Sequence, residues 1–395
     1  MPVEFLIFGL ALAGVAILHR HALPIAATGL ACIVAFEWLV TQFPTGPGGA
    51  GLAEHFAHEW VTLVNLLCLL VGFAMVAAHF EKSGIPAALP RYLPDDWTGA
   101  FALLAIVFLI SGFLDNIAAA LIGGAMAHTL FRGQVRVGYL AAIVAASNAG
   151  GAGSVIGDTT TTMMWIQGVS PAEVIHAYLA SAAALLVFGL SAARQQQRFA
   201  TIVRDADETQ SIDWLRVLIV AFVLASAVTV NVFVNLRYPE LADRFPFIGA
   251  TVAMSLLMTI GIRQPDWRAL PAAFKGSIFL LCLVASASLM PVESLPAASW
   301  KTALALGFVS AGFDNIPLTA MALQQGGYDW GVLAYAVGFG GSMLWFGSSA
   351  GVAICGMYPE ARSTDRWLRE GWLIPVAYLA GFALLLLALG WQPGG

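Results

Sequence analysis

Long apolar stretches, separated by short polar segments, run through almost the whole chain of 395 residues. Apolar stretches of about 17–25 residues are long enough for a helix to cross the hydrocarbon core of a bilayer. The pattern therefore predicts an all-α polytopic membrane protein with about ten transmembrane helices. We place them at 4–19, 22–43, 60–80, 137–168, 172–195, 214–236, 245–263, 275–291, 330–357 and 372–391.

Two further apolar stretches, 99–131 and 298–325, each carry an Asp-Asn pair near the middle. Each stretch divides into two limbs of about 14 residues, which as helices would span only about 21 Å. Because such a limb is too short to cross a membrane alone, we predict two re-entrant hairpins with Asp-Asn at their tips. A single kinked span is the alternative interpretation of each stretch.

The positions of the basic residues favour the hairpins. If both hairpins return to the face from which they enter, 15 of the 18 Lys and Arg residues fall on one face. The positive-inside rule then predicts that this face is cytoplasmic, with both termini outside, in the cytoplasmic (inner) membrane. The basic residues of this face are Arg20, Lys82, Arg91, Arg132, Arg136, Arg194, Arg198, Arg204, Arg216, Arg263, Arg268, Lys275, Arg362, Arg366 and Arg369.

The layout also predicts two repeats. Residues 1–200 give three spans, a hairpin and two spans, and residues 214–395 give the same order after a polar cytoplasmic linker at 201–213. Because each repeat crosses the membrane five times, an odd number, the second repeat should be inverted relative to the first. The first hairpin then enters from the cytoplasm and the second from outside, and their tips can meet near the midplane.

Composition agrees with this class and narrows the chemistry. The chain is 59% hydrophobic and only 10% charged, which excludes an ordinary soluble globular protein and a nucleic-acid-binding surface. We expect membrane lipid around it and no cofactor. Its four cysteines lie singly within apolar runs, which indicates packing residues and not disulfides or metal ligands.

A polar motif recurs in the two halves. Each Asp-Asn pair is followed, after a similar interval, by a Gly-Gly pair and, six positions after its second glycine, by a further glycine. A carboxylate within a membrane costs about 2.5–3.5 kcal/mol or more, so a functional role is favoured over a helix N-cap alone, although Asp can do both. The motif residues are Asp115, Asn116, Gly150, Gly151 and Gly157 in the first half and Asp314, Asn315, Gly340, Gly341 and Gly347 in the second.

A third carboxylate, Asp158, follows the first glycine frame and precedes four threonines. Four glycines and a Thr run predict a broken helix at membrane depth, which would expose backbone groups beside hard oxygen ligands that suit a small cation. We expect at least two of the four threonines to bond to their own backbone. Further candidate ligands are Asn148, Thr159 and Thr160, and in the second half Ser348 and Ser349, which stand in place of Asp158 and Thr159. We expect Asp115, Asp158 and Asp314 to converge and to bind Na⁺ or a proton.

These segments resemble the NhaD-type sodium/proton antiporters of the ion transporter superfamily. The resemblance rests on Asp115-Asn116, on the segment from Ala149 to Thr161, on Asp314-Asn-Ile-Pro-Leu and on the segment 340–353, which together make up 34 of the 395 residues. It implies an elevator-type carrier, commonly dimeric, with a scaffold and a moving domain that contains both hairpins. It also implies exchange of Na⁺ or Li⁺ for H⁺ at the matching Asp and Asn positions. Where the family usually has threonines after the first Asp-Asn, this chain has Ala118-Ala119-Ala120, which leaves the cation's identity open.

The function that these residues favour is cation/proton exchange by alternating access, with proton and cation competing for the aspartates. The alternative is a carrier of a small anion, such as a dicarboxylate, citrate or arsenite, because half-helix N-termini suit an anion. The aspartates would repel a dianion, and no Lys or Arg falls at membrane depth to hold a carboxylate. An intramembrane aspartyl protease is disfavoured because the Gly-x-Gly-Asp frame is absent, so we do not expect an enzyme.

Overall fold

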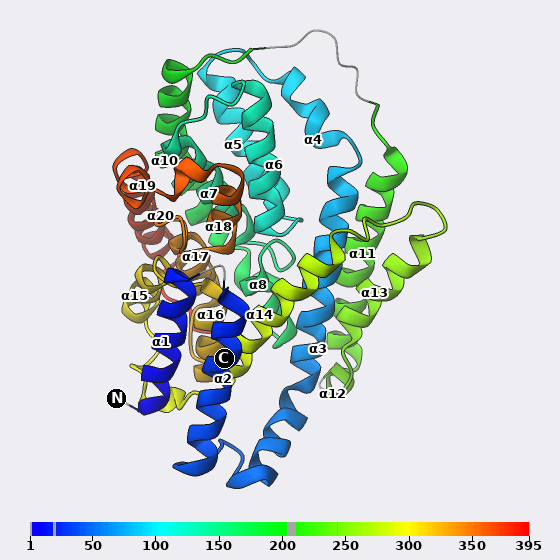
Figure 1. The fold of residues 1–395 in the computed structure, drawn as a ribbon, viewed down its shortest axis with the longest axis vertical. Helices are drawn as coiled ribbons and strands as arrows, with labels where there is room; N and C mark the ends of the chain where they lie inside the picture. The colour runs from blue at the N-terminus through cyan, green and yellow to red at the C-terminus, as the bar shows by residue number, and fades with distance from the viewer. Residues whose placement is uncertain (1, 19–20, 204–210, 243, 395) are drawn as a thin grey trace.

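The computed structural model describes residues 2–18, 21–203, 211–242 and 244–394. Within these ranges the secondary structure is helical and contains no β-strand, which confirms the predicted all-α class. Helix α10 (Ala177–Phe199) ends and helix α11 (Trp214–Arg237) begins at the same end of the molecule, at the top of Figure 1. We call this end the linker face and the other end the opposite face.

The same order of elements occurs in both halves of the chain: three helices, a helix–turn–helix, a broken helix and a last long helix. The first half contains α1 (Val3–Ile17), α2 (Ala22–Leu39), α3 (Gly48–Glu81), α4 (Ile85–Ala88), η2 (Leu89–Tyr92), α5 (Trp97–Ser111), α6 (Asn116–Leu130), α7 (Val137–Gly151), α8 (Thr159–Ile166), α9 (Pro171–Val174) and α10. The second half contains α11, α12 (Pro239–Ala242), α13 (Phe247–Thr259), α14 (Leu270–Ser288), η3 (Val292–Ser294), α15 (Trp300–Ser310), α16 (Asn315–Gln325), α17 (Trp330–Gly340), α18 (Ser349–Met357), η4 (Pro359–Arg362), α19 (Thr364–Glu370) and α20 (Leu373–Leu389).

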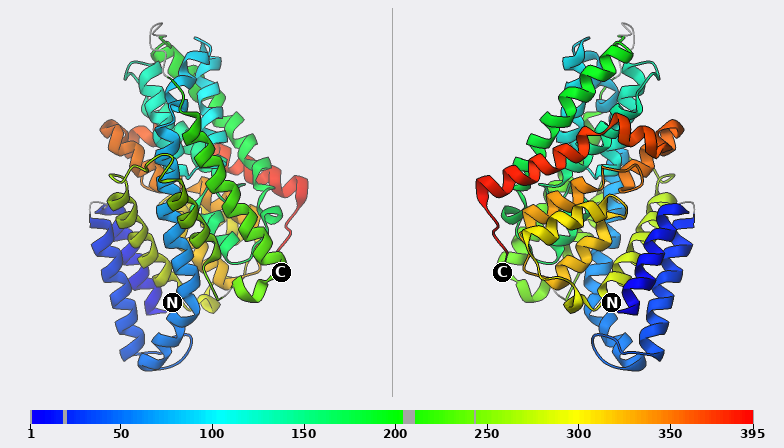
Figure 2. Two further views of the ribbon diagram at one scale, coloured as in Figure 1. Left: turned by 90° about the vertical axis from the view of Figure 1, so that its right-hand side faces the viewer. Right: turned by 90° about the vertical axis from the view of Figure 1, so that its left-hand side faces the viewer.

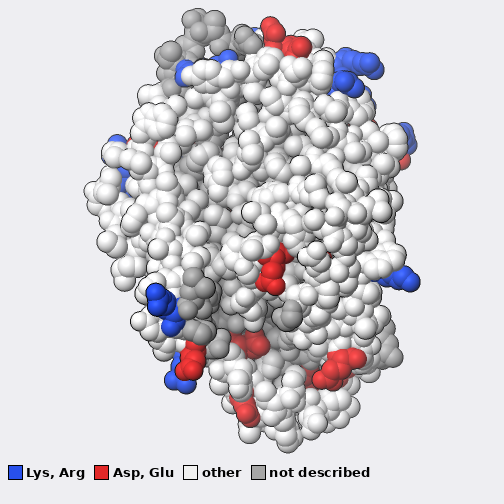
Figure 3. All heavy atoms as spheres, turned by 180° about the vertical axis from the view of Figure 1, so that it is seen from behind, with Lys and Arg blue, Asp and Glu red and all other residues white. Residues whose placement is uncertain are grey.

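The helices that suit a membrane are fewer than the ten spans predicted. In the described part of the chain, five are long and apolar enough to cross a bilayer alone, and the bent pair α19–α20 makes a sixth. The other four predicted spans are shorter or divided: α1 and α13 have 15 and 13 residues, and the spans at 137–168 and 330–357 are each broken in two. The chain is a multi-pass membrane protein, and one of its faces, shown in Figure 3, is uncharged over most of its area.

Each stretch with an Asp-Asn pair folds as two short helices joined by a tight turn. Helices α5 and α6 have 15 residues each, and α15 and α16 have 11 each. At 1.5 Å per residue these limbs are about 16 to 23 Å long, less than the roughly 30 Å of a hydrocarbon core. The two helical limbs and the position of Asp-Asn at each turn agree with the predicted hairpins.

The two broken helices form the centre of the molecule. Every residue of α7 and of α17 is buried, because small and apolar side chains let neighbouring helices approach from all sides. Around them pack α5, α6, α10, α15, α18 and α20. A second group of helices, α1 to α3, α11, α13 and α14, packs mainly on itself, and in Figures 1 and 2 it lies beside the first group.

Candidate functional site

Four short helices begin close to one another with a side-chain cap. Asp115 caps α6, Asp158 caps α8, Asp314 caps α16 and Ser348 caps α18, through oxygens that accept backbone N–H groups at 3.1 to 3.3 Å. The first N–H groups of a helix lack partners within the helix, which is why such caps form. The expectation that the tip aspartates serve as N-caps is therefore confirmed. The partial positive charge of each helix start is met by the chain's own oxygen atoms.

Asp158 lies at the meeting point of the two halves and is only 2% exposed. Its Oδ1 lies 3.4 Å from Nδ2 of Asn116, and its Oδ2 lies 3.5 Å from Nδ2 of Asn315. Each asparagine belongs to the tip of one hairpin. Both hairpin tips thus converge on the carboxylate of the first broken helix, which brings together three of the predicted residues.

A buried polar chain extends from Asp158 toward the second broken helix. Asn116 donates through Nδ2 to Oδ1 of Asn148 at 3.1 Å, and Asn148 donates to Oγ of Ser342 at 3.0 Å and Oγ of Ser348 at 3.1 Å. Asn148 therefore links the two broken helices through its amide. Ser342 was not predicted, although its position directly after Gly340-Gly341 could have suggested it.

The second hairpin aspartate has a different neighbour. Ser349 donates through Oγ to Oδ2 of Asp314 at 2.8 Å. Among the described residues, no group of three or more Asp, Glu, His or Cys side chains could hold one metal ion together. The carboxylate of Asp314 thus accepts a hydrogen bond from a hydroxyl, while Asp158 contacts the asparagine that follows each hairpin aspartate.

Two of the four threonines bond to the local backbone through their hydroxyls, and the other two lie beside Asp158 or the cavity. Thr161 and Thr162 donate their hydroxyls to the backbone carbonyl of Asp158, and both also reach a carbonyl in the preceding break. This confirms that two of the four bond to their own backbone. Thr160 contacts Asp158 through its backbone N–H, and Thr159 faces the cavity described next.

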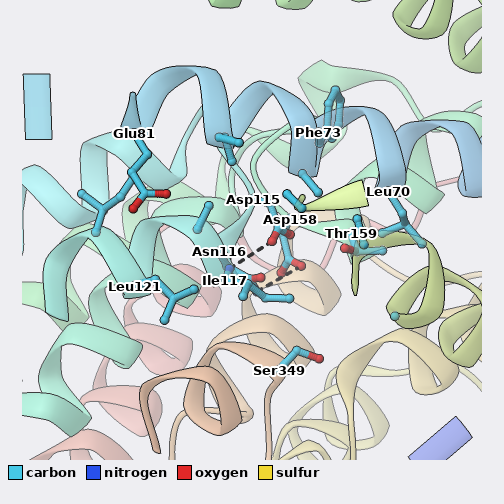
Figure 4. Close-up of a pocket in the computed structure, with 18 of the residues that line it drawn as sticks. Leu70, Phe73, Glu81, Asp115, Asn116, Ile117, Leu121, Asp158, Thr159 and Ser349 are labelled. Carbon is cyan, nitrogen blue, oxygen red and sulfur yellow. Dashed lines mark hydrogen bonds between the residues drawn. The ribbon is translucent and has the colours of Figure 1, made fainter. Parts of the chain in front are cut away.

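A cavity of about 750 Å³ leads from these residues toward the linker face. Its walls are the second half of α3, the first half of α14 and most of α6, and Figure 4 shows Asp115 and Asp158 close together on its wall. Among the described residues that line it, the charged ones are Glu81, Asp115 and Asp158, and none is Lys, Arg or His. Most of the remaining wall is apolar, so the carboxylates dominate its electrostatics.

Only some of the predicted site residues line this cavity. Those on its wall are Asp115, Asn116, Asp158, Thr159, Asn315 and Ser349. The others do not line it: Asn148 and Ser348 belong to the buried polar chain, Thr160 is fully buried, and Asp314 is partly exposed and accepts a hydrogen bond from Ser349, which does line the cavity.

The three alanines after the first Asp-Asn pair are not equivalent. Ala118 lines the cavity, whereas Ala119 and Ala120 are fully buried against neighbouring helices. A hydroxyl at 118 would therefore face the site, but hydroxyls at the next two positions would meet packed side chains.

The motif glycines are explained by close packing of backbones. A Cβ on Gly150 would collide with the carbonyl of Phe108 in α5, and a Cβ on Gly340 would collide with the carbonyl of Gly307 in α15. In each half the broken helix therefore lies directly on the first limb of its own hairpin. The other motif glycines are packed equally closely. Gly151 and Gly341 lie against the carbonyls of Gly157 and Gly347 across the break, and Gly157 and Gly347 lie against the backbone of a hairpin turn.

Gly150→Ala should lower the thermal stability of the purified protein. The added methyl group has no room against the backbone of α5, and a backbone, unlike a flexible side chain, cannot yield without moving the helix. Gly9→Ala is the matched control, since it also lies within a helix but a Cβ there meets nothing within 4 Å. Unfolding monitored by fluorescence in detergent compares the two, and equal melting temperatures would contradict the packing described.

Curated relatives cover most of the chain, although no protein-family model matches it. "Sodium/proton antiporter 1" of Arabidopsis thaliana is 26% identical over 89% of this chain and 66% of its own length, just under two thirds. "Sodium/proton antiporter 2" of the same plant is 26% identical over 89% of this chain and 91% of its own length. "Na(+)/H(+) antiporter NhaD" of Vibrio cholerae is 26% identical over 85% of this chain and 80% of its own length.

The similarity extends well beyond the four motif segments that first suggested the family. All three relatives carry the name of a transporter, and the apolar helices of this chain agree with a membrane protein. By its sequence the chain is a homologue of the NhaD-type sodium/proton antiporters, which are membrane transporters and not enzymes.

Proposed function

We propose that this protein exchanges Na⁺ or Li⁺ for H⁺ across a membrane, and that Asp115 and Asp158 bind the cation and the proton in turn. The observation that carries the proposal is the cavity, whose charged lining residues among those described are all acidic. A negatively charged, low-dielectric cleft concentrates cations and repels anions. The names of the relatives support the same chemistry.

The oxygen atoms near Asp158 suit a small hard cation. Carboxylates of Asp115 and Asp158 supply charge, and neutral oxygens of Thr159 and Asn116 are available on the same wall. Two neighbouring carboxylates in an apolar surrounding are poorly stable when both are ionised and unpaired, so a proton or a cation should accompany them. Binding of one then displaces the other, which is the basis of exchange. Asp314, held by Ser349, provides a further carboxylate close to the site.

Alternating access requires that the site face each side in turn. In this structure the large cavity reaches Glu81 at the end of α3 and Ala269 just before α14, both at the linker face. The positive-inside rule predicts that this face is cytoplasmic, so the conformation is inward-facing in our proposal. The two groups of packed helices would be the scaffold and the moving domain of an elevator-type carrier with inverted repeats. The homodimer that the family resemblance implies is part of the same proposal.

Transport of a small anion is the less favoured alternative. It depended on half-helix N-termini that carry free N–H groups, but three of the four helix starts are capped by aspartates of the chain itself. A carboxylate substrate would also find no basic side chain among the described residues of the cavity wall.

The proposal is tested by proton flux in proteoliposomes that contain an internal pH dye. We expect that Na⁺ or Li⁺ added outside at pH 7 to 9 moves protons in the opposite direction, and that citrate and arsenite have no effect. Accumulation of an anion without any cation-driven proton movement would contradict the proposal and support the alternative.

Ala118→Thr should raise the apparent affinity for Na⁺ or Li⁺. The new hydroxyl would face the cavity one turn from Asp115 and could add a neutral oxygen ligand without adding charge. Ala119→Thr is the control, because that position is buried away from the cavity. The apparent KM for each cation in the dye assay separates the two, and an unchanged KM in Ala118→Thr would exclude position 118 from the cation's ligands.

A further inference from the structure

A second, much smaller cavity lies where α3 and α14 meet α8 and α16. Its volume is about 90 Å³. Helices α3 and α14 line it, as they line the large cavity, but here they contribute their other halves together with α16 and the end of α8. We call it the crevice, and its lining residues are Glu59, Thr62, Met163, Gln167, Val284, Ser288, Ala320, Leu323 and Gln324.

The crevice and the large cavity lie toward opposite ends of one uninterrupted helix. Glu59 in the crevice and Glu81 in the cavity are both on α3, which runs without a break for 34 residues. The 22 positions between them correspond to about 33 Å of helix, close to the roughly 30 Å of a hydrocarbon core. The crevice therefore lies toward the opposite face, and its charged lining residue is again acidic.

The site lies between the two spaces. Helix α8 begins at the cap Asp158 and has eight residues, so it is about 12 Å long. Gln167, the residue after its last turn, lines the crevice. One end of α8 thus borders the large cavity, and its other end borders the crevice.

Two contacts join the helices that line the crevice. Gln167 donates through Nε2 to Oγ1 of Thr62 at 3.1 Å, which joins the end of α8 to α3. Helix α14 packs against α16 on the same side, and Ser288 and Leu323 from these helices both line the crevice. On the linker side, by contrast, the large cavity separates α3 and α14 from α6.

We propose that the crevice is the second access path to the site, closed in this structure, and that the Thr62–Gln167 hydrogen bond breaks when it opens. Glu59 then stands at the mouth of this path as Glu81 stands at the mouth of the other, so that cations meet an acidic side chain on either side. This inference rests on the proposed exchange function and assigns its second opening to specific residues. The same helix, α3, serves as the fixed wall of both paths.

Cross-linking across the hydrogen bond tests the inference. In a chain whose four native cysteines are replaced, Thr62→Cys and Gln167→Cys are joined with a short bifunctional thiol reagent that is cleaved by reduction. We expect exchange in proteoliposomes to fall to the level of empty liposomes after linking and to return on reduction. Binding of Na⁺ from the linker face should persist in the linked protein.

A matched pair at the other end of α3 is the control. Lys82 and Asp266 form a salt bridge of 2.8 Å between α3 and the segment that precedes α14. Because α3 and α14 belong to one packed group, linking Lys82→Cys to Asp266→Cys should leave exchange within about twofold of the unlinked rate. Loss of exchange only in the Thr62–Gln167 pair supports the inference.

The outcomes separate the inference from the function on which it rests. Full exchange in the linked Thr62–Gln167 protein would overturn the inference while leaving sodium/proton exchange intact. Absence of cation-driven proton movement in the unmodified protein would instead overturn the proposed function. If the double variant does not fold, Leu323→Cys provides a second test: an impermeant maleimide added from the opposite face should label it faster under a sodium gradient, and equal labelling with and without the gradient would overturn the inference.

Discussion

Asp158→Asn should abolish sodium-coupled proton exchange and leave a folded protein. Asparagine has nearly the same shape and its amide oxygen can still cap α8, so the local helix start should survive. The substitution removes the charge on which both hairpin asparagines converge, and a neutral amide can neither take up a proton nor balance a cation at neutral pH. Exchange should fall to the level of empty liposomes, while the elution profile of the purified protein stays unchanged.

Asp329→Asn is the matched control for this experiment. Asp329 is also a buried aspartate that caps a helix, in this case α17, but its carboxylate pairs with His176 and lies outside the large cavity. The control variant should retain exchange per folded molecule. Equal loss of exchange per folded molecule in both variants would mean that the loss does not depend on the position of Asp158 at the cavity, and the assignment of Asp158 to the site would fail.

The apparent KM for Na⁺ should rise steeply as the pH falls. A proton and a cation that compete for the same carboxylates exclude each other, so each lost pH unit should raise KM by up to about tenfold per competing proton, once the site is mostly protonated. The maximal rate at saturating Na⁺ should change much less. Initial rates in the dye assay between pH 6 and 9, at several Na⁺ concentrations, measure both quantities.

A different pattern would point to a different mechanism. If acid lowered the maximal rate and left KM unchanged, protons would act at a separate regulatory group. The aspartates would then bind only the cation.

Helix length explains why much of the fold was predictable from sequence. The limbs around each Asp-Asn pair are too short to cross a membrane alone, and the glycine frames marked where α7 and α17 end. Fewer helices are long enough to cross alone than the ten spans predicted, because two of those spans are broken helices and because a hydrophobic stretch such as 245–263 does not reveal that its helix, α13, has only 13 residues. Whether the halves are inverted stays a prediction from the count of crossings.

The residues of the candidate site were predictable from the sequence, but the hydrogen bonds between them were not. The sequence predicted that Asp115, Asp158 and Asp314 converge, with Asn116 and Asn315 beside them, whereas in the structure the two asparagines contact Asp158 and Asp314 bonds to Ser349. It gave no sign that Asn148 would bond to Ser342, 194 positions away, since such a contact depends on how two broken helices pack. It also did not show that Asp314 would face Ser349 and not the cavity.

The crevice residues were missed for a related reason. Thr62, in the middle part of α3, and Gln167, directly after α8, are ordinary polar residues that belong to no motif, so nothing in the sequence distinguishes them. Their proposed role follows only from the structure, in which their hydrogen bond joins α3 to the end of α8 beside Glu59.

Proton release on cation binding tests the central claim most directly. Purified protein in weakly buffered detergent solution near pH 8 is mixed with NaCl, and the released protons are measured with a pH dye, with choline chloride as the reference. Competition at one site predicts that Na⁺ releases protons in a saturable way, that choline releases none, and that Asp158→Asn loses the response. Saturable Na⁺ binding without proton release in the unmodified protein would contradict a shared site for the two ions.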